Sequence, residues 1–330
     1  MATRFINKGP NAAGASTGSA AGIGVEDDVF YFNPGSGRIA LQTKHRSGKD
    51  YYIDFQNGAS NNSGGSWSKA KKQIADITAL ANNDVIFIKG VLREHYSAPE
   101  NVFDVSIVGA ANTPRQATED GVATGAGATW LAPTSPTAAT PLLKLREQGW
   151  TLQNLFMSAE TDGECVYLNR LETDANRDAS HFAAYGCVFG GGLYGIRDVG
   201  GNGYVQIKGC RFQNISGSSA YAIRNTSTSI ANPLQWEIVD NVFRNNKNHI
   251  LSPLSQAKVA HNDFGIVGNS VTAVIACSLT GGLNNSVFLN ILNRPANTSP
   301  NATLYVGGTN DLWTHNYGTD AVIYGVPDNS

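Results

Sequence analysis

After residue 84 the chain alternates short apolar segments with polar turns, and a helical period does not return. Residues 51–55 alternate in polarity, and residues 84–90 form a nearly continuous apolar run that is typical of a strand buried on both faces. Residues 29–32 form another apolar segment, which ends at Asn33-Pro34-Gly35, and residues 38–41 are its expected hairpin partner. The pattern predicts an all-β protein.

Two segments depart from this pattern. Trp67, Ala70, Ile74, Ile77 and Leu80 follow helical spacing, so a helix is predicted over about residues 67–81. Residues 113–141 are rich in Thr, Ala, Pro and Gly and are predicted to be a long surface loop around Trp130.

The most informative pattern is a degenerate repeat of Asn or Cys, any residue, and then a large apolar residue. The clear copies are Asn154-Leu155-Phe156, Cys187-Val188-Phe189, Cys210-Arg211-Phe212, Asn241-Val242-Phe243 and Asn262-Asp263-Phe264. Weaker copies begin at Asn290 and Asn316, and successive copies are 33, 23, 31, 21, 28 and 26 residues apart. Short strands and turns that recur every 20 to 50 residues, roughly, are typical of a solenoid, whose turns bury their apolar faces by stacking.

The first residues of these copies should then lie above one another. Stacked Asn side chains can hydrogen-bond to each other as a ladder, and Cys packs at the same place with less polarity. The predicted ladder consists of Asn154, Cys187, Cys210, Asn241, Asn262, Asn290 and Asn316.

With this repeat, the chain resembles the right-handed parallel β-helix superfamily, the pectin-lyase-like fold. The strand at residues 52–54, the Gly/Asn-rich loop after it, the segment 65–81 and the strand at 84–88 match a recurrent opening of that superfamily. The resemblance covers about residues 50–325 and implies that the predicted helix closes the N-terminal end, with Trp67 as a plug of the core. It implies little about function, because the fold carries lyases, hydrolases, phage tailspikes and binding proteins.

Composition narrows the function classes. Only 15% of the residues are charged and the net charge is −2, which argues against a nucleic-acid binder that neutralises phosphates. The apolar share of 41% argues against a wholly disordered chain, and no apolar run is long enough for a membrane span. The four cysteines form no C-x-x-C pair and the six histidines lack metal-ligand spacing, so we expect free buried thiols, no metal and no cofactor.

The first 48 residues differ from the rest. Residues 9–22 are almost entirely Gly, Ala, Ser, Thr and Asn and have little to bury. We expect residues 1–48 to be an extended arm or anchor with a short β element, and residues 49–330 to be the β-helix domain.

Candidate site residues fall into two groups. A catalytic or calcium site would need converging carboxylates, but the acids here are sparse and more typical of solvated loops. The weak catalytic candidates are Asp162, Glu164, Asp174, Asp178, Asp198 and Glu237. Aromatic rings offer flat faces to sugars, and the glycan-binding candidates are Tyr194, Tyr204, Tyr221 and Trp236.

The sequence leaves three functions open. The first is a bacteriophage virion protein (a spike, fibre or capsid decoration), expected to be a homotrimer on the particle surface. It would be attached to other virion proteins through residues 1–48 and could bind host surface polysaccharide. The arm, the absence of a visible secretion signal and the lack of an evident catalytic set favour it. The alternative is a polysaccharide lyase or glycoside hydrolase. The third is a non-viral adhesin-like surface protein, against which the absence of a visible signal peptide weighs.

Overall fold

The computed structural model describes residues 22–26, 29–33, 39–42, 48–110, 128–136, 139–169, 178–217, 219–226, 233–265, 276–293 and 305–318. The chain divides into two compact units, Met1–Ser47 and Gly48–Ser330. In the first unit three antiparallel strands pair in the order β1, β2, β3, with bounds Gly22–Glu26, Val29–Asn33 and Ile39–Gln42.

The described part of the second unit is built from three parallel sheets. A ten-stranded sheet contains β4 (Asp50–Asp54), β5 (Val85–Lys89), β8 (Ser106–Gly109), β11 (Thr151–Gln153), β14 (Ala183–Tyr185), β17 (Gln206–Lys208), β20 (Glu237–Val239), β23 (Lys258–Ala260), β26 (Ser286–Phe288) and β29 (Leu312–Thr314). A nine-stranded sheet contains β6 (Val91–Arg93), β9 (Thr129–Leu131), β12 (Phe156–Ala159), β15 (Val188–Gly191), β18 (Arg211–Gln213), β21 (Val242–Arg244), β24 (Asp263–Gly265), β27 (Ile291–Asn293) and β30 (Tyr317–Gly318). An eight-stranded sheet contains β7 (Tyr96–Ser97), β10 (Pro141–Leu145), β13 (Glu164–Asn169), β16 (Tyr194–Val199), β19 (Tyr221–Asn225), β22 (Ile250–Leu251), β25 (Cys277–Ser278) and β28 (Tyr305–Val306).

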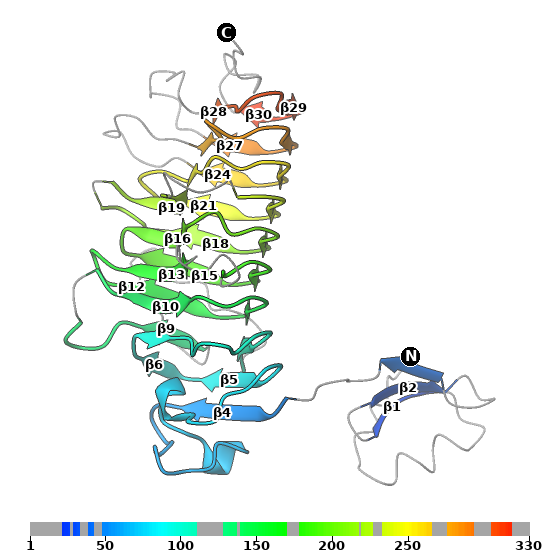
Figure 1. Ribbon diagram of the computed structural model, residues 1–330, viewed down its shortest axis with the longest axis vertical. Coiled ribbons are helices and arrows are strands. Elements are labelled where there is room, and N and C mark those ends of the chain that lie inside the picture. Colours follow the sequence, from blue (N-terminus) through cyan, green and yellow to red (C-terminus); the bar gives the residue numbers. More distant parts are fainter. Residues whose placement is uncertain are drawn as a thin grey trace. The chain divides into compact units, whose positions relative to one another are not determined.

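From β5 onward each coil of the chain adds one strand to each sheet in turn, and each strand pairs in parallel with the strand three places along the chain, as β10 does with β13 (Figure 1). The first strand, β4, pairs with β5. The predicted right-handed parallel β-helix is confirmed. Because each inner coil pairs on both sides, its backbone groups are satisfied, and the apolar side of the strands faces one continuous core.

The predicted helix over residues 67–81 is wrong. The segment contains two short 3-10 turns, η1 (Trp67–Lys69) and η2 (Ile74–Asp76), separated by extended backbone. Lys71 pairs with the open edge of β4 instead: Asp54 N–H donates to its carbonyl at 3.0 Å and Lys71 N–H donates to Tyr52 O at 2.9 Å. The edge strand thus gains partners that a helix could not supply, while Ile74 is still buried at the end of the coil.

Two tryptophans also lie elsewhere than predicted. Trp67 is 38% exposed and packs edge-on against Tyr52, with ring centroids 4.9 Å apart, so it does not plug the core. Trp130, placed by the sequence in a surface loop, belongs to β9 and is fully buried, and its Nε1–H donates to Glu94 O at 2.9 Å. A tryptophan ring whose N–H has a hydrogen-bond partner is more stable in the core than in solvent, even where the surrounding sequence is rich in Thr, Ala, Pro and Gly.

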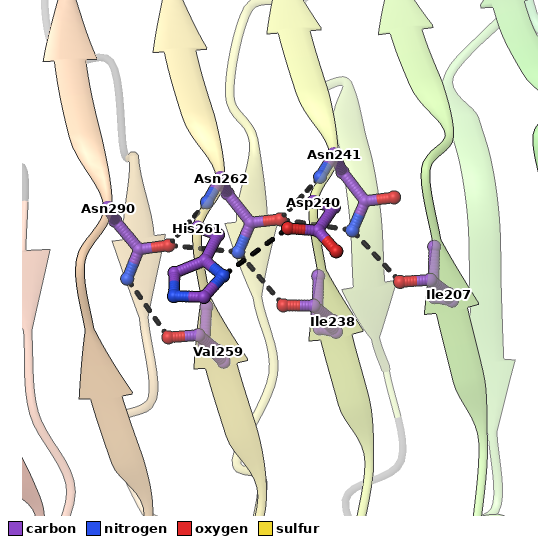
Figure 2. Close-up of polar contacts among 8 residues, drawn as sticks. All are labelled: Ile207, Ile238, Asp240, Asn241, Val259, His261, Asn262 and Asn290. Atoms are coloured by element: carbon purple, nitrogen blue, oxygen red, sulfur yellow. Dashed lines mark hydrogen bonds and ion pairs between the residues drawn. The ribbon is translucent and has the colours of Figure 1, made fainter.

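The turn between the ten- and nine-stranded sheets carries a ladder of buried asparagines (Figure 2). Asn262 Oδ1 accepts from both the N–H and the Nδ2 of Asn241, each at 3.0 Å, and Asn290 Oδ1 accepts from the same two groups of Asn262 at 2.9 Å. Asn290 donates in the same way to Asn316. Each Nδ2 also donates to a strand carbonyl, that of Ile238 for Asn262. The amide therefore satisfies backbone groups that the tight turn leaves unpaired.

Cys187 and Cys210 occupy the equivalent position on earlier coils, and Cys210 N–H donates to Asn241 Oδ1 at 2.8 Å. Asn154 does not belong to this row. Strand register places Leu155 at the ladder position, because Phe156 pairs with Val188. Asn154 lies one residue earlier, at a φ of 53°, where a short polar side chain tolerates the left-handed backbone. The sequence repeat aligned Asn154 with Cys187, whereas the strand register aligns Leu155 with Cys187.

Aromatic side chains fill the core beneath the nine-stranded sheet. Phe189, Phe212, Phe243 and Phe264 stack on successive coils with ring centroids 4.9 to 5.0 Å apart. All four cysteines are buried and free. The core is thus a column of like residues, one per coil, which keeps the strands above them in register.

Candidate functional site

The outer face of the eight-stranded sheet carries a row of cations and aromatic rings on β10, β13, β16 and β19, which lie one above another in Figure 1. On β16 and β19 two buried residues separate two partly exposed ones, Tyr194 from Arg197 and Tyr221 from Arg224, so each strand presents a ring and a cation on this face. In one column, register aligns Lys144, Tyr167, Arg197 and Arg224; in the next it aligns Glu164, Tyr194 and Tyr221. We call the cations and rings the cation–aromatic strip: Lys144, Tyr167, Tyr194, Arg197, Tyr221 and Arg224.

Cations and rings alternate in contact along the strip. Lys144 Nζ lies 5.5 Å from the centroid of Tyr167, and the Arg197 guanidinium lies 5.6 Å from Tyr167 and 5.2 Å from Tyr194. The Arg224 guanidinium lies 5.9 Å from Tyr194 and 4.5 Å from Tyr221. Each contact holds a long side chain against a ring, so the charged groups are ordered before any ligand arrives.

One carboxylate lies within the strip. Glu164 Oε1 accepts from Arg197 at 2.6 Å, and Arg197 Nε donates to Thr226 Oγ1 at 3.1 Å. Burial raises the pKa of Glu164, although the hydrogen bond and charge of Arg197 act in the opposite direction. Burial and the neighbouring Arg146 lower the pKa of Lys144. The other Glu164 oxygen and Arg224 Nε are buried without a hydrogen-bond partner in the structure.

The sequence-predicted aromatics are divided between three places. Tyr194 and Tyr221 lie in the strip. Tyr204 is 50% exposed but lies outside the strip, in the turn before β17 of the ten-stranded sheet. Its ring stacks on His181 with ring centroids 4.8 Å apart. Trp236 is only 1% exposed and donates from Nε1 to Asn202 O at 2.7 Å, so its prediction as a glycan contact is corrected to a core role.

Of the carboxylates predicted as weak catalytic candidates, Glu164 lies in the strip. Asp162 is exposed beside it in the chain, and Asp178 accepts from Gln148 Nε2 at 3.2 Å and from Ser180 N–H at 3.0 Å. Glu237 belongs to the ten-stranded sheet, where it pairs with Lys208. Asp174 lies outside the described residues.

Asp198 is fully buried at the end of β16 and accepts hydrogen bonds from the side chains of Asn202 and Asn225. Burial raises the pKa of this carboxyl to about 7, while the amide donors act to lower it. It anchors the turn after β16, since Asn202 Oδ1 in turn accepts from Ala179 N–H at 2.7 Å. Without solvent access it cannot meet a polysaccharide.

Asp198 should make stability depend on pH. The pKa of this carboxyl is higher in the folded chain than its unfolded value of about 3.9. Its contribution to the free energy of unfolding is therefore complete below about pH 3.9 and is lost as the pH rises through about 7. We expect Asp198→Asn to gain in unfolding free energy relative to the parent chain across this window, because the amide does not ionise. Urea denaturation at pH values across it measures the difference, and a difference that does not change with pH would contradict the prediction.

Sequence reasoning missed the cations of the strip. The signal was present as a second repeat, Tyr194-Gly195-Ile196-Arg197 and Tyr221-Ala222-Ile223-Arg224, which are 27 residues apart. Pairing these segments in register as β16 and β19 puts Tyr on Tyr and Arg on Arg.

Within the described ranges, no three His, Cys, Asp or Glu side chains are grouped so as to hold a metal ion. In the same part of the chain, no helix has the length and apolar character needed to cross a membrane.

The structure is similar to several solved structures. The pectate lyase Pel9A superposes with a TM-score of 0.56 at 12% identity, over 81% of this chain and 70% of the lyase chain. A tailspike protein, gp49 from the Acinetobacter baumannii bacteriophage Fri1, described as a capsular polysaccharide depolymerase, gives a TM-score of 0.39 at 12% identity over 91% of this chain and 70% of its own. ORF18 of Geobacillus virus E2 gives 0.40 at 9% identity over 96% and 75%.

No protein-family model and no curated protein matches the chain. At the scores of the two phage proteins the likeness carries no argument, so the assignment rests on the three parallel sheets and on the pectate lyase superposition. The chain therefore has the right-handed parallel β-helix fold.

Proposed function

We propose that the cation–aromatic strip binds an acidic polysaccharide that runs along the coil axis, across the strands. The observation that carries this proposal is the unbroken alternation of cations and rings from Lys144 to Arg224, on a chain whose net charge is −2. A local excess of positive charge on a nearly neutral molecule favours an anionic ligand.

The chemistry of the strip suits sugars. Tyrosine rings offer flat apolar faces to sugar rings, with a hydroxyl at the rim for hydrogen bonds. Guanidinium groups bind carboxylates in a planar, bidentate manner. Neighbouring parallel strands are about 4.8 Å apart, which is close to the length of one sugar unit in an extended chain, so successive coils can meet successive units.

Arg224→Ala is expected to weaken binding of an acidic polysaccharide about tenfold, because it removes a charge-assisted contact. Affinity electrophoresis in gels that contain the polysaccharide measures the change, and added salt should weaken binding of the parent chain. Arg244→Ala is the matched control: this arginine pairs with Asp263 on the nine-stranded sheet, so net charge changes equally outside the strip. Equal losses in both variants would contradict the proposed site.

Tyr221 and Tyr204 provide a second matched pair for the same assay. Tyr221→Ala removes a ring from the strip, whereas Tyr204→Ala removes an exposed ring outside it. Binding should fall only in the first variant.

The proposal extends to a bacteriophage virion protein, a homotrimeric spike, fibre or decoration that displays the strip toward host polysaccharide. Support comes from the Gly/Ala/Ser-rich stretch at residues 9–22 and from the separate compact unit Met1–Ser47, which suit an attachment segment to other virion proteins. Mass spectrometry of purified particles and sedimentation analysis of the full chain test these statements; absence from particles would contradict the virion role.

A second candidate is a polysaccharide lyase or glycoside hydrolase acting at the same strip. Glu164 favours it, because burial raises the pKa of this carboxyl and a guanidinium lies beside it, an arrangement found at acid–base sites. Release of reducing ends or of unsaturated uronate, lost in Glu164→Gln, would establish turnover.

A further inference from the structure

Charge is unevenly distributed along the strip. Arg197 is neutralised by Glu164 at 2.6 Å, and its side chain is 30% exposed. Lys144 and Arg224, at the two ends of the column, make cation–π contacts but form no ion pair within the described residues. Three strand steps, about 14 Å, separate them along the axis. The strip therefore offers two cationic points with a neutral stretch between them.

Glu164 gives that neutral stretch a chemical preference. Its side chain is only 6% exposed, and Oε2 is buried without a hydrogen-bond partner. A second negative charge placed above this carboxylate is unfavourable, because little water is present to screen the repulsion. A neutral sugar therefore fits here, and a sugar carboxylate does not.

We infer that the strip selects a heteropolysaccharide in which acidic groups are separated by neutral sugars, and that Glu164 excludes polymers with an acid on every unit. The inference rests on the proposed function and specifies its substrate class. An acidic group binds at Lys144 or Arg224, while the neutral sugars beside it stack on Tyr167 and Tyr194 and lie over the Glu164–Arg197 ion pair.

The test compares two probes in affinity electrophoresis at equal uronate concentration. Sodium gellan of low molecular weight has a single glucuronate in each tetrasaccharide repeat, so a chain with its acid at either cationic point places neutral sugars over Glu164. Polygalacturonate has an acid on every unit and cannot do so. The parent chain should bind gellan more tightly. Glu164→Gln keeps the shape of the side chain and its acceptor toward Arg197 but removes the charge, so the ratio of the two affinities should shift about fivefold toward polygalacturonate.

Glu237→Gln is the matched control, since it removes an equal charge from the ten-stranded sheet and should leave the ratio unchanged. Thermal unfolding of each variant checks that it is folded. Equal retention of both probes by the parent chain, or an unchanged ratio in Glu164→Gln, overturns this inference and leaves the proposed function standing. Retention of neither probe overturns both.

Discussion

Asn262→Ala is expected to lower the free energy of unfolding by about 4 kcal/mol, because the variant leaves several buried polar groups without partners. Asn262 Oδ1 accepts from the N–H and Nδ2 of Asn241, and its own Nδ2 donates to Ile238 O and Asn290 Oδ1 (Figure 2). An alanine side chain can neither accept nor donate these hydrogen bonds, and the position is too buried for water to replace them. Equilibrium denaturation with urea measures the loss.

Asn61→Ala is the matched control for this prediction. Asn61 is exposed and its side chain forms no hydrogen bond with the part of the chain that the structure describes, so the same chemical change should cost no more than about 0.5 kcal/mol. A loss below about 1 kcal/mol in Asn262→Ala would show that the ladder is not a source of stability.

Phe212→Ala is expected to cost about 4 kcal/mol as well, because it leaves a cavity in the middle of the aromatic column. The ring lies between Phe189 and Phe243, with centroids 5.0 and 4.9 Å away. It also packs directly against Gly195 of β16, where an added Cβ would come within 2.8 Å of it. The ring thus supports the strand that carries Tyr194 and Arg197.

The loss of the Phe212 ring should also affect polysaccharide binding. Phe212→Ala should weaken acidic-polysaccharide binding in addition to lowering the urea midpoint, whereas Phe212→Leu, which keeps most of the volume, should lose less of both. Binding that stays at the parental level in a destabilised Phe212→Ala chain would contradict the coupling between the core column and the strip.

The spacing of apolar residues gave a wrong prediction at the N-terminal end of the coil, where it indicated a helix. Ile74, Ile77 and Leu80 are buried, as their spacing requires, yet they reach the core from turns and extended backbone. The open edge of β4 decides this, since its unpaired groups bond to Lys71. A helix propensity of a few tenths of a kcal/mol per residue cannot outweigh such pairing.

A second buried polar ladder went unnoticed in the sequence. At the turn before the ten-stranded sheet, Asn285 donates from its N–H and Nδ2 to Asp311 Oδ1, each at 2.9 Å, and its own Oδ1 accepts from Ala257 N–H. The pairs Asn284-Asn285 and Asn310-Asp311 were its only sign. Two adjacent polar residues are common in any turn, so the pattern alone does not distinguish a buried amide from an exposed one.

The sequence by itself determined the architecture of the coil. A repeat of Asn or Cys before a large apolar residue requires stacking, because a single turn of this size cannot bury its own apolar face. The same repeat located the buried asparagines from Asn241 to Asn316 and the phenylalanine column.

Only the tertiary structure decided the candidate site. Lys144, Tyr167, Arg197 and Arg224 are up to 80 residues apart, and each one alone is an ordinary polar residue of a short strand. Their alignment depends on strand register between coils of unequal length, and a shift of one residue would turn every one of these side chains inward. Register is set by the core and by the turns together, and for that reason it emerges only in the assembled coil.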